Sequence, residues 1–136
     1  TPTLAGKYSE EFNIYAGPKE ILGKSISLFR EVATDNGRDL KKLEITTACP
    51  PVVGLTKEGV GASLTVAAKA LAQTEDEIAS TWREKNYLFG TPDEVASTLS
   101  MWQEVGIEAV YLQLLSLKED QRNETIDVIN KAVDLI

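Results

Sequence analysis

The chain has 136 residues, of which 43% are hydrophobic and 26% charged, a composition typical of one globular domain and not of a disordered segment. Its 14 basic and 21 acidic residues give a net charge of -7, which would repel a nucleic-acid backbone, and no apolar run in the sequence is long enough to span a membrane. Histidine is absent, which removes the commonest general base and metal ligand, and the single cysteine excludes an internal disulfide.

The amino-terminal residues and the cysteine content bear on where the protein works. Residues 1–4 have neither the basic start nor the apolar centre of a secretory signal. One lone cysteine agrees with a reducing compartment. We therefore expect a cytoplasmic protein with no metal site, no nucleic-acid partner and no membrane contact.

Hydrophobic periodicity and turn residues predict two strands and one long helix in the first half of the chain. Ile21, Phe29 and Ala33 belong to an apolar stripe at helical spacing, which Asn36 and Gly37 close. The predicted elements, in chain order, are the end of a helix at residues 3–10, a strand at 12–15, a helix at 18–36, a strand at 43–49 and an extended stretch at 52–54.

The second half of the chain predicts four helices and one strand. Thr74 and Glu77 have the spacing of a capping box, which opens a helix that turns Ile78 and Trp82 inward. The predicted elements are helices at 57–71 and from residue 74, a helix at 91–105, a strand at 109–115 and a helix at 120–136. The first two of these helices form an insertion at 57–85 between strands.

Residues 90–115 predict one complete helix-then-strand unit. Thr91 and Glu94 are spaced to form a capping box, and Gly106 ends the helix. The run at 109–115 is almost continuously apolar, which is typical of a strand in a parallel sheet with helices packed outside it. Such a strand needs several neighbours.

The alternation of helices and strands predicts an α/β fold with a parallel sheet and right-handed crossovers. Only three strands are predicted with any length. Three parallel strands leave one sheet face and both edges bare, and a closed barrel of eight such units takes about 250 residues.

Three segments resemble a known family in the same order along the chain. They are Gly90-Thr91-Pro92-Asp93-Glu94-Val95 with Gly106-Ile107-Glu108-Ala109-Val110-Tyr111-Leu112-Gln113, Leu4-Ala5-Gly6-Lys7-Tyr8-Ser9-Glu10-Glu11-Phe12-Asn13, and Gly37-Arg38-Asp39 before the strand at 43–49. Together they resemble the bacterial luciferase-like monooxygenase superfamily, whose members are flavin- or deazaflavin-dependent oxidoreductases. The second segment departs from the family, which favours alanine, arginine, aspartate and tryptophan where this chain has Gly6, Lys7, Glu10 and Phe12.

The resemblance implies that residues 1–136 form a single partial domain, the carboxy-terminal part of a (β/α)₈ TIM barrel, at about strands 6 to 8. The first five strands would be absent. The glycine-rich loop that holds the cofactor phosphate in relatives would lie before Thr1. The partner of this chain would then be the missing amino-terminal part of the barrel, or a second copy of the chain.

The resemblance also implies an activity for the full-length protein: hydride transfer between a deazaflavin (coenzyme F420) or flavin (FMN) and a small organic substrate. Residues 8–13 look more like the F420 branch. The chain alone is expected to be inactive and not to retain the cofactor. The alternative is a non-catalytic α/β module that completes its sheet by self-association or with a partner chain.

Candidate site residues follow from the barrel, because barrel enzymes place their chemistry at the carboxyl ends of the strands. The last strand has an apolar face at Val110, Leu112 and Leu114, so Tyr111 and Gln113 would point into the lumen. The candidates for binding cofactor or substrate are Asn13, Tyr15, Thr47, Gln113, Ser116 and Arg122.

Four of these candidates also have a structural interpretation. Gln113 can be satisfied by neighbouring backbone, Asn13 can have a structural role, Tyr15 can close a core with its hydroxyl in water, and Arg122 can be a solvated surface residue. Cys49 has no nearby basic residue to lower its pKa, so we expect a buried hydrophobic side chain and not a nucleophile.

Overall fold

The computed structural model describes residues 1–114 and 117–136. Its helices are α1 (Pro2–Tyr8), α2 (Lys19–Asp35), α3 (Lys57–Leu71), α4 (Glu75–Glu84), α5 (Pro92–Val105) and α6 (Glu119–Asp134), with a short 3₁₀ turn η1 (Leu40–Lys42). Its strands are β1 (Glu11–Tyr15), β2 (Glu44–Cys49), β3 (Val52–Val53), β4 (Phe89–Gly90) and β5 (Ala109–Leu112). Within the described residues, no helix is both long enough and apolar enough to cross a bilayer.

The main sheet has the strand order β1-β2-β5, and both pairings are parallel. The predicted α/β fold with a parallel sheet is therefore confirmed. The last strand pairs as far as Leu112, shorter than the predicted 109–115, although the Gln113 backbone N–H still donates to the Cys49 carbonyl at 3.1 Å. Residue 115, at the predicted end of this strand, lies outside the described residues.

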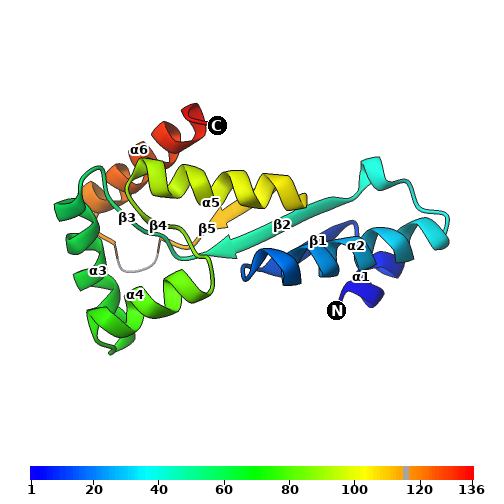
Figure 1. Ribbon diagram of the computed structural model, residues 1–136, viewed down its shortest axis with the longest axis horizontal. Coiled ribbons are helices and arrows are strands. Elements are labelled where there is room, and N and C mark those ends of the chain that lie inside the picture. The colour runs from blue at the N-terminus through cyan, green and yellow to red at the C-terminus, as the bar shows by residue number, and fades with distance from the viewer. Residues whose placement is uncertain (115–116) are drawn as a thin grey trace.

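A second, two-stranded sheet was not predicted. β3 pairs with β4 in parallel, so Val52 lies beside Phe89 and Val53 beside Gly90. The extended stretch predicted at 52–54 is thus a separate strand, while β4 is too short to give a periodic pattern. This small sheet lies where the chain leaves the carboxyl end of β2, next to α3 and α4 at one end of the molecule (Figure 1).

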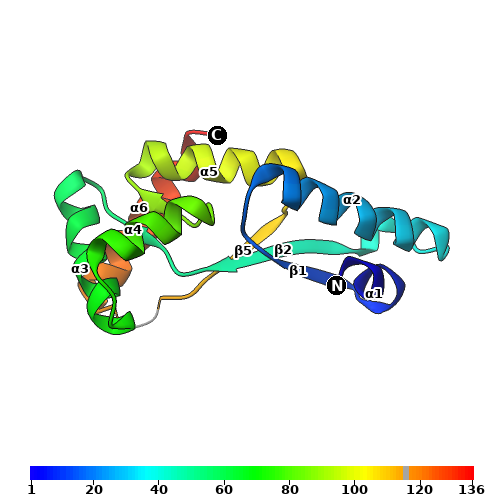
Figure 2. The same cartoon turned by 60° about the horizontal axis from the view of Figure 1, so that its bottom comes forward.

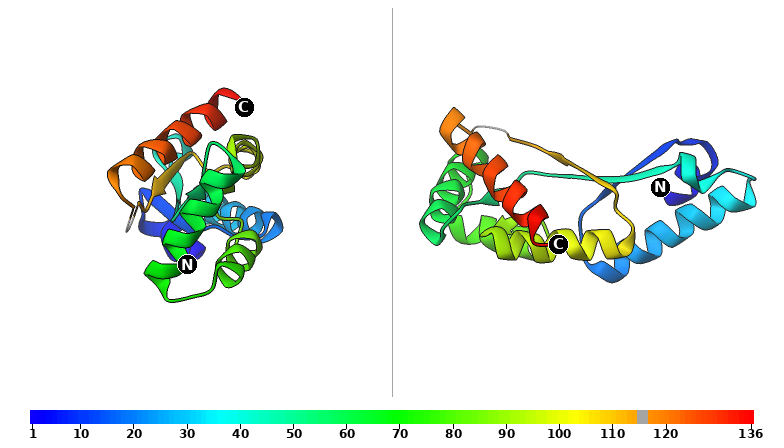
Figure 3. Two further views of the ribbon diagram at one scale, coloured as in Figure 1. Left: turned by 90° about the vertical axis from the view of Figure 1, so that its left-hand side faces the viewer. Right: turned by 90° about the horizontal axis from the view of Figure 1, so that it is seen from above.

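Pairing in register gives the main sheet two different faces. Phe12 aligns with Ile45, and Cys49 aligns with Leu112, so apolar side chains of all three strands project to one side. α2 and α5 run along this side of the strands (Figures 2 and 3). The opposite side carries Glu11 and Glu44, both exposed.

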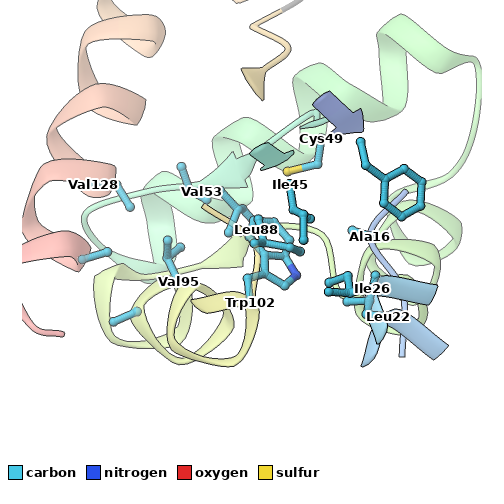
Figure 4. Close-up of a cluster of buried hydrophobic side chains, with 14 of the residues drawn as sticks. Ala16, Leu22, Ile26, Ile45, Cys49, Val53, Leu88, Val95, Trp102 and Val128 are labelled. Atoms are coloured by element: carbon cyan, nitrogen blue, oxygen red, sulfur yellow. The ribbon is translucent and has the colours of Figure 1, made fainter. Parts of the chain in front are cut away.

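The hydrophobic core fills the space between the sheet and these helices (Figure 4). Trp102 and Phe29 are 1% exposed and are its largest fully buried side chains. A smaller cluster of Val52, Ala68, Ile78 and Trp82 joins β3 to α3 and α4. Both tryptophans are buried, as the sequence predicts.

Local sequence accounts for the ends of the helices. The Glu77 backbone N–H donates to the Thr74 hydroxyl at 3.1 Å, and the Glu77 carboxylate accepts the Thr74 backbone N–H at 2.9 Å, which completes the predicted capping box. The Glu94 carboxylate accepts the Thr91 backbone N–H at 2.8 Å in the same way. Gly106 ends α5 with a φ of 104°, which a residue with a side chain adopts only under strain.

Replacing Gly54 by alanine is expected to destabilise the fold. A Cβ at Gly54 would overlap the backbone of Gly59 and Val60, where the chain after β3 passes the start of α3. We expect the G54A variant to lose about 1 to 3 kcal/mol of unfolding free energy in urea denaturation.

Gly61→Ala is the matched control, because Gly61 lies in α3, the helix that Gly54 approaches, and a Cβ there meets nothing within 4 Å. It is expected to leave stability unchanged or to raise it by about 0.5 to 1 kcal/mol. Equal stabilities for the two variants would show that β3 and α3 do not approach as closely as described.

Candidate functional site

The face of the main sheet opposite α2 and α5 is called the open face. Near the carboxyl ends of the strands it carries a row of three residues, because Tyr15 aligns with Ala48 and Ala48 aligns with Tyr111. Tyr15 is 88% exposed and Tyr111 is 52% exposed. These three residues are called the tyrosine row, in which one phenol ring lies on each side of the Ala48 methyl group.

Beneath the tyrosine row, the open face holds a hydrogen-bonded polar network. The Asn13 side-chain amide donates to the Thr46 hydroxyl at 2.9 Å, and that hydroxyl donates to the Glu11 carboxylate at 2.5 Å. Thr46 is fully buried under these neighbours. The network therefore fixes polar side chains of β1 and β2 on a face that an ordinary core would make apolar.

Glu11 also changes the pKa of Tyr111 in the tyrosine row. Its carboxylate raises the pKa of Tyr111 through its negative charge and by accepting the phenol hydrogen, and the charge of Glu44 adds the smallest part of the effect. The Tyr111 phenol therefore keeps its proton to a higher pH than an ordinary tyrosine does, and its O–H remains the donor to Glu11.

An apolar pocket of about 330 Å³ lies near the carboxyl ends of β2 and β5, because Pro50 and Gln113 belong to its lining. It lies between α3, α4 and the chain that follows β2, and it is called the α3–α4 pocket. Gln113, two residues beyond Tyr111 on the same side of β5, belongs to its lining. The pocket thus lies at the end of the sheet where the resemblance places a site.

The structure brings three of the predicted site residues to one face. Asn13 and Tyr15 lie on the open face of β1, and Gln113 lies where the open face meets the pocket. Arg122 is exposed in the first turns of α6 and does not line the pocket. Ser116 lies outside the described residues.

Thr47 is not brought to this site. It aligns with Ile14 and Val110, whose side chains face the helices, and its hydroxyl donates to the Ile14 carbonyl at 2.7 Å. Side chains alternate along a strand, so the neighbours of Thr47, Thr46 and Ala48, occupy the open face instead. The sequence placed the candidate in the correct strand but did not show which face of the sheet its side chain occupies.

Cys49 is fully buried on the helix side of β2. Burial raises the pKa of its thiol to about 11, despite a hydrogen bond with the backbone at Leu88 that lowers it. The predicted role as a buried hydrophobic side chain, with no nucleophilic character, agrees with this environment.

Sequence reasoning missed Ala48, Thr46 and Glu11 as components of the site. Ala48 carries no functional group, so only its alignment with the two tyrosines reveals its place. A signal for Tyr111 was present, because it alternates with Gln113 along the last strand. The pocket has no linear signal, since it depends on how α3 and α4 pack against β3.

No protein-family model and no curated protein sequence matches the chain. Solved structures do match its fold. An F420-dependent secondary alcohol dehydrogenase in complex with an F420-acetone adduct aligns with a TM-score of 0.69 and 21% identity, over 96% of this chain and 45% of that chain. A monooxygenase from Streptomyces bottropensis aligns with a TM-score of 0.74 and 17% identity, over 98% of this chain and 44% of that chain.

A riboflavin lyase with modified FMN and riboflavin aligns with a TM-score of 0.65 and 16% identity, over 98% of this chain and 40% of that chain. The chain therefore has the fold of part of each of these structures, which agrees with the fold that the sequence resemblance implies. This chain spans less than half the length of each of these three structures.

Replacing Glu11 by glutamine is expected to lower the pKa of Tyr111 toward the ordinary tyrosine value, because the nearby negative charge is removed. The measurement is an NMR pH titration of the Tyr111 ring. Glu44→Gln is the control and should lower the pKa less, since Glu44 contributes the smallest part. An unchanged Tyr111 titration in the E11Q variant would contradict the described contact.

Proposed function

We propose that this chain forms one wall of the active site of an oxidoreductase that uses F420 or FMN. It would supply about strands 6 to 8 of a (β/α)₈ barrel, with the open face turned into the lumen. The observation that supports this most directly is the alignment of nearly the whole chain with part of F420- and FMN-containing structures. The tyrosine row lies at the carboxyl ends of the strands, where barrel enzymes place their chemistry.

The free edges and the open face of the main sheet support the proposed barrel. β1 and β5 each pair with β2 alone, so each has one free edge within the described residues. The open face is polar at Glu11 and Asn13 but carries exposed aromatic rings at Tyr15 and Tyr111. Further strands on both edges would pair the free backbone groups and enclose this mixed surface as a lumen.

The tyrosine row fits the flat ring system of either cofactor. Neighbouring strands lie about 4.8 Å apart, so the Tyr15 and Tyr111 backbones are about 10 Å apart with only the Ala48 methyl between them. A planar ring can lie over Ala48 and contact both phenols, in the offset or edge-on geometries that aromatic rings prefer. The Gln113 amide can donate hydrogen bonds to ring carbonyls, and the Tyr111 oxygen, whose hydrogen goes to Glu11, can accept one from a ring N–H.

The phosphate-bearing tail of the cofactor would need a cation. Arg122 follows β5 early in α6, is exposed, and makes no ion pair with another described residue. A guanidinium at this place can pair with a phosphate or with a carboxylate of the substrate.

F420 or FMN, when bound, would supply the hydride chemistry, and the protein would bind and orient the reacting groups. The residues of this chain would hold the ring on the tyrosine row and keep the Tyr111 phenol protonated beside it. We favour F420, because residues 8–13 resemble that branch of the family.

A second candidate is a non-catalytic module whose sheet is completed by another copy of the chain. The observation that favours it is the same pair of free strand edges, since an open parallel edge can pair with a second chain. Light scattering on the purified chain separates the candidates, because this module must form a stable oligomer without any cofactor.

The cofactor proposal predicts that FMN and F420 perturb the tyrosine row. Titration of the 136-residue chain to about 1 mM cofactor should move the NMR signals of the Ala48 methyl and the Tyr15 and Tyr111 rings, because the cofactor ring lies against them. At this concentration, NMR detects binding free energies as weak as about -4 kcal/mol. Y15A and Y111A should each weaken binding about 3- to 10-fold through lost ring contact.

Tyr8→Ala is the matched control, because Tyr8 is 78% exposed on α1 and is not part of the row. This variant should bind as the wild type does. The cofactor proposal is wrong if the signals of the tyrosine row stay unchanged, or if Y8A weakens binding as much as Y15A.

A further inference from the structure

The α3–α4 pocket is lined mostly by apolar side chains. They come from α3, α4, the proline pair after β2 and the chain after β5. Representative lining residues are Pro51, Val66, Ala67, Ala70, Trp82 and Gln113. All of its lining residues belong to the described part of the chain, and none of them carries a charge.

The polar groups of the lining are almost all satisfied inside the protein. The Ser63 hydroxyl donates to the Val53 carbonyl at 2.7 Å, and the Trp82 indole N–H donates to the Pro50 carbonyl at 2.7 Å. Of the lining side chains, Gln113 alone has polar atoms that bond to no other described residue. A ligand in this pocket therefore meets hydrocarbon on most sides and one amide.

The size of the pocket sets the size of its ligand. A volume of about 330 Å³ lies within the range of small-molecule sites. At about 30 Å³ for each non-hydrogen atom, taken from the share of one water in the liquid, it holds roughly ten such atoms.

Gln113 connects the pocket to the tyrosine row. Two residues of a strand span about 6.6 Å, so one small molecule can reach from Gln113 to Tyr111. A ligand bound through Gln113 would therefore have its polar group at the edge of the tyrosine row and its hydrocarbon part between α3 and α4.

We propose that the α3–α4 pocket binds the hydrocarbon part of a neutral small molecule of roughly ten non-hydrogen atoms, with the Gln113 amide as the partner of its single carbonyl or hydroxyl group. The pocket selects against charged molecules, because a carboxylate or ammonium group would lose its hydration among apolar walls without an opposite charge. The description of this ligand as the substrate rests on the proposed function, whereas binding itself does not.

The test is calorimetric titration of the chain with methyl ketones of increasing length, butanone, hexanone and octanone. Each added methylene should tighten binding about three- to fourfold, because it removes that much more apolar surface from water. Octanoate and octylamine, which match octanone in length, should bind at least about 10-fold more weakly. The methyl signals of Ala67, Ala70 and Val66 should move in NMR spectra as octanone binds.

Two variants with one matched control locate the site. Ala70→Phe should abolish octanone binding, because Ala70 is an exposed residue of the lining and a phenyl ring there fills the pocket. Gln113→Leu should weaken octanone about 3- to 10-fold while leaving octane unaffected, since one hydrogen bond is lost. Ala62→Phe, an exposed residue of α3 that does not line the pocket, should change neither.

Three results would each overturn this proposal: no binding of any ketone, octanoate binding as tightly as octanone, or an equal loss of binding in A62F and A70F. Methyl mapping on the wild-type chain keeps the test valid if A70F fails to fold. Octanone binding without any effect of FMN or F420 on the tyrosine row would reject the proposed function and keep the pocket. The reverse result would reject the pocket alone.

Discussion

The in-register parallel pairing of β1, β2 and β5 is the constraint on which the rest of this structure depends. A strand alternates its side chains between two faces, so a shift of one residue exchanges them all. In the observed register, Ile45 and Cys49 lie under the helices, while Thr46 and Ala48 lie on the open face. The tyrosine row, the polar network and the mouth of the pocket all follow from that alignment.

The two faces of the sheet differ in chemistry as well as in exposure. The helix side is closed by apolar packing around Trp102, which stabilises the fold. On the open side, polar side chains form hydrogen bonds with one another, and Thr46 is held between Asn13 and Glu11. A wall of this kind suits a site that orients a polar, flat ligand, and the adjoining α3–α4 pocket adds an apolar compartment. Gln113 belongs to both regions and links them.

Sequence patterns predicted the features that depend on local interactions. The capping box at Thr74 and Glu77, the end of α5 at Gly106 and the alternation of Tyr111 with Gln113 are encoded within a few residues and were found in the structure. The placement of Thr47 failed because the face it occupies is fixed by pairing with distant strands. β4 and the α3–α4 pocket escaped prediction for the same reason, since each requires segments far apart in sequence to meet.

The most direct test of this account measures the register and the exposure of the open face together by solution NMR, with a neutral gadolinium chelate as a probe of exposure. We predict contacts between the Ala48 methyl and both the Tyr15 and Tyr111 rings, with fast relaxation of these rings and protection of the Ile45 methyl groups. Contacts of Tyr111 with Cys49 in place of Ala48, or equal protection of the two faces, would contradict the account.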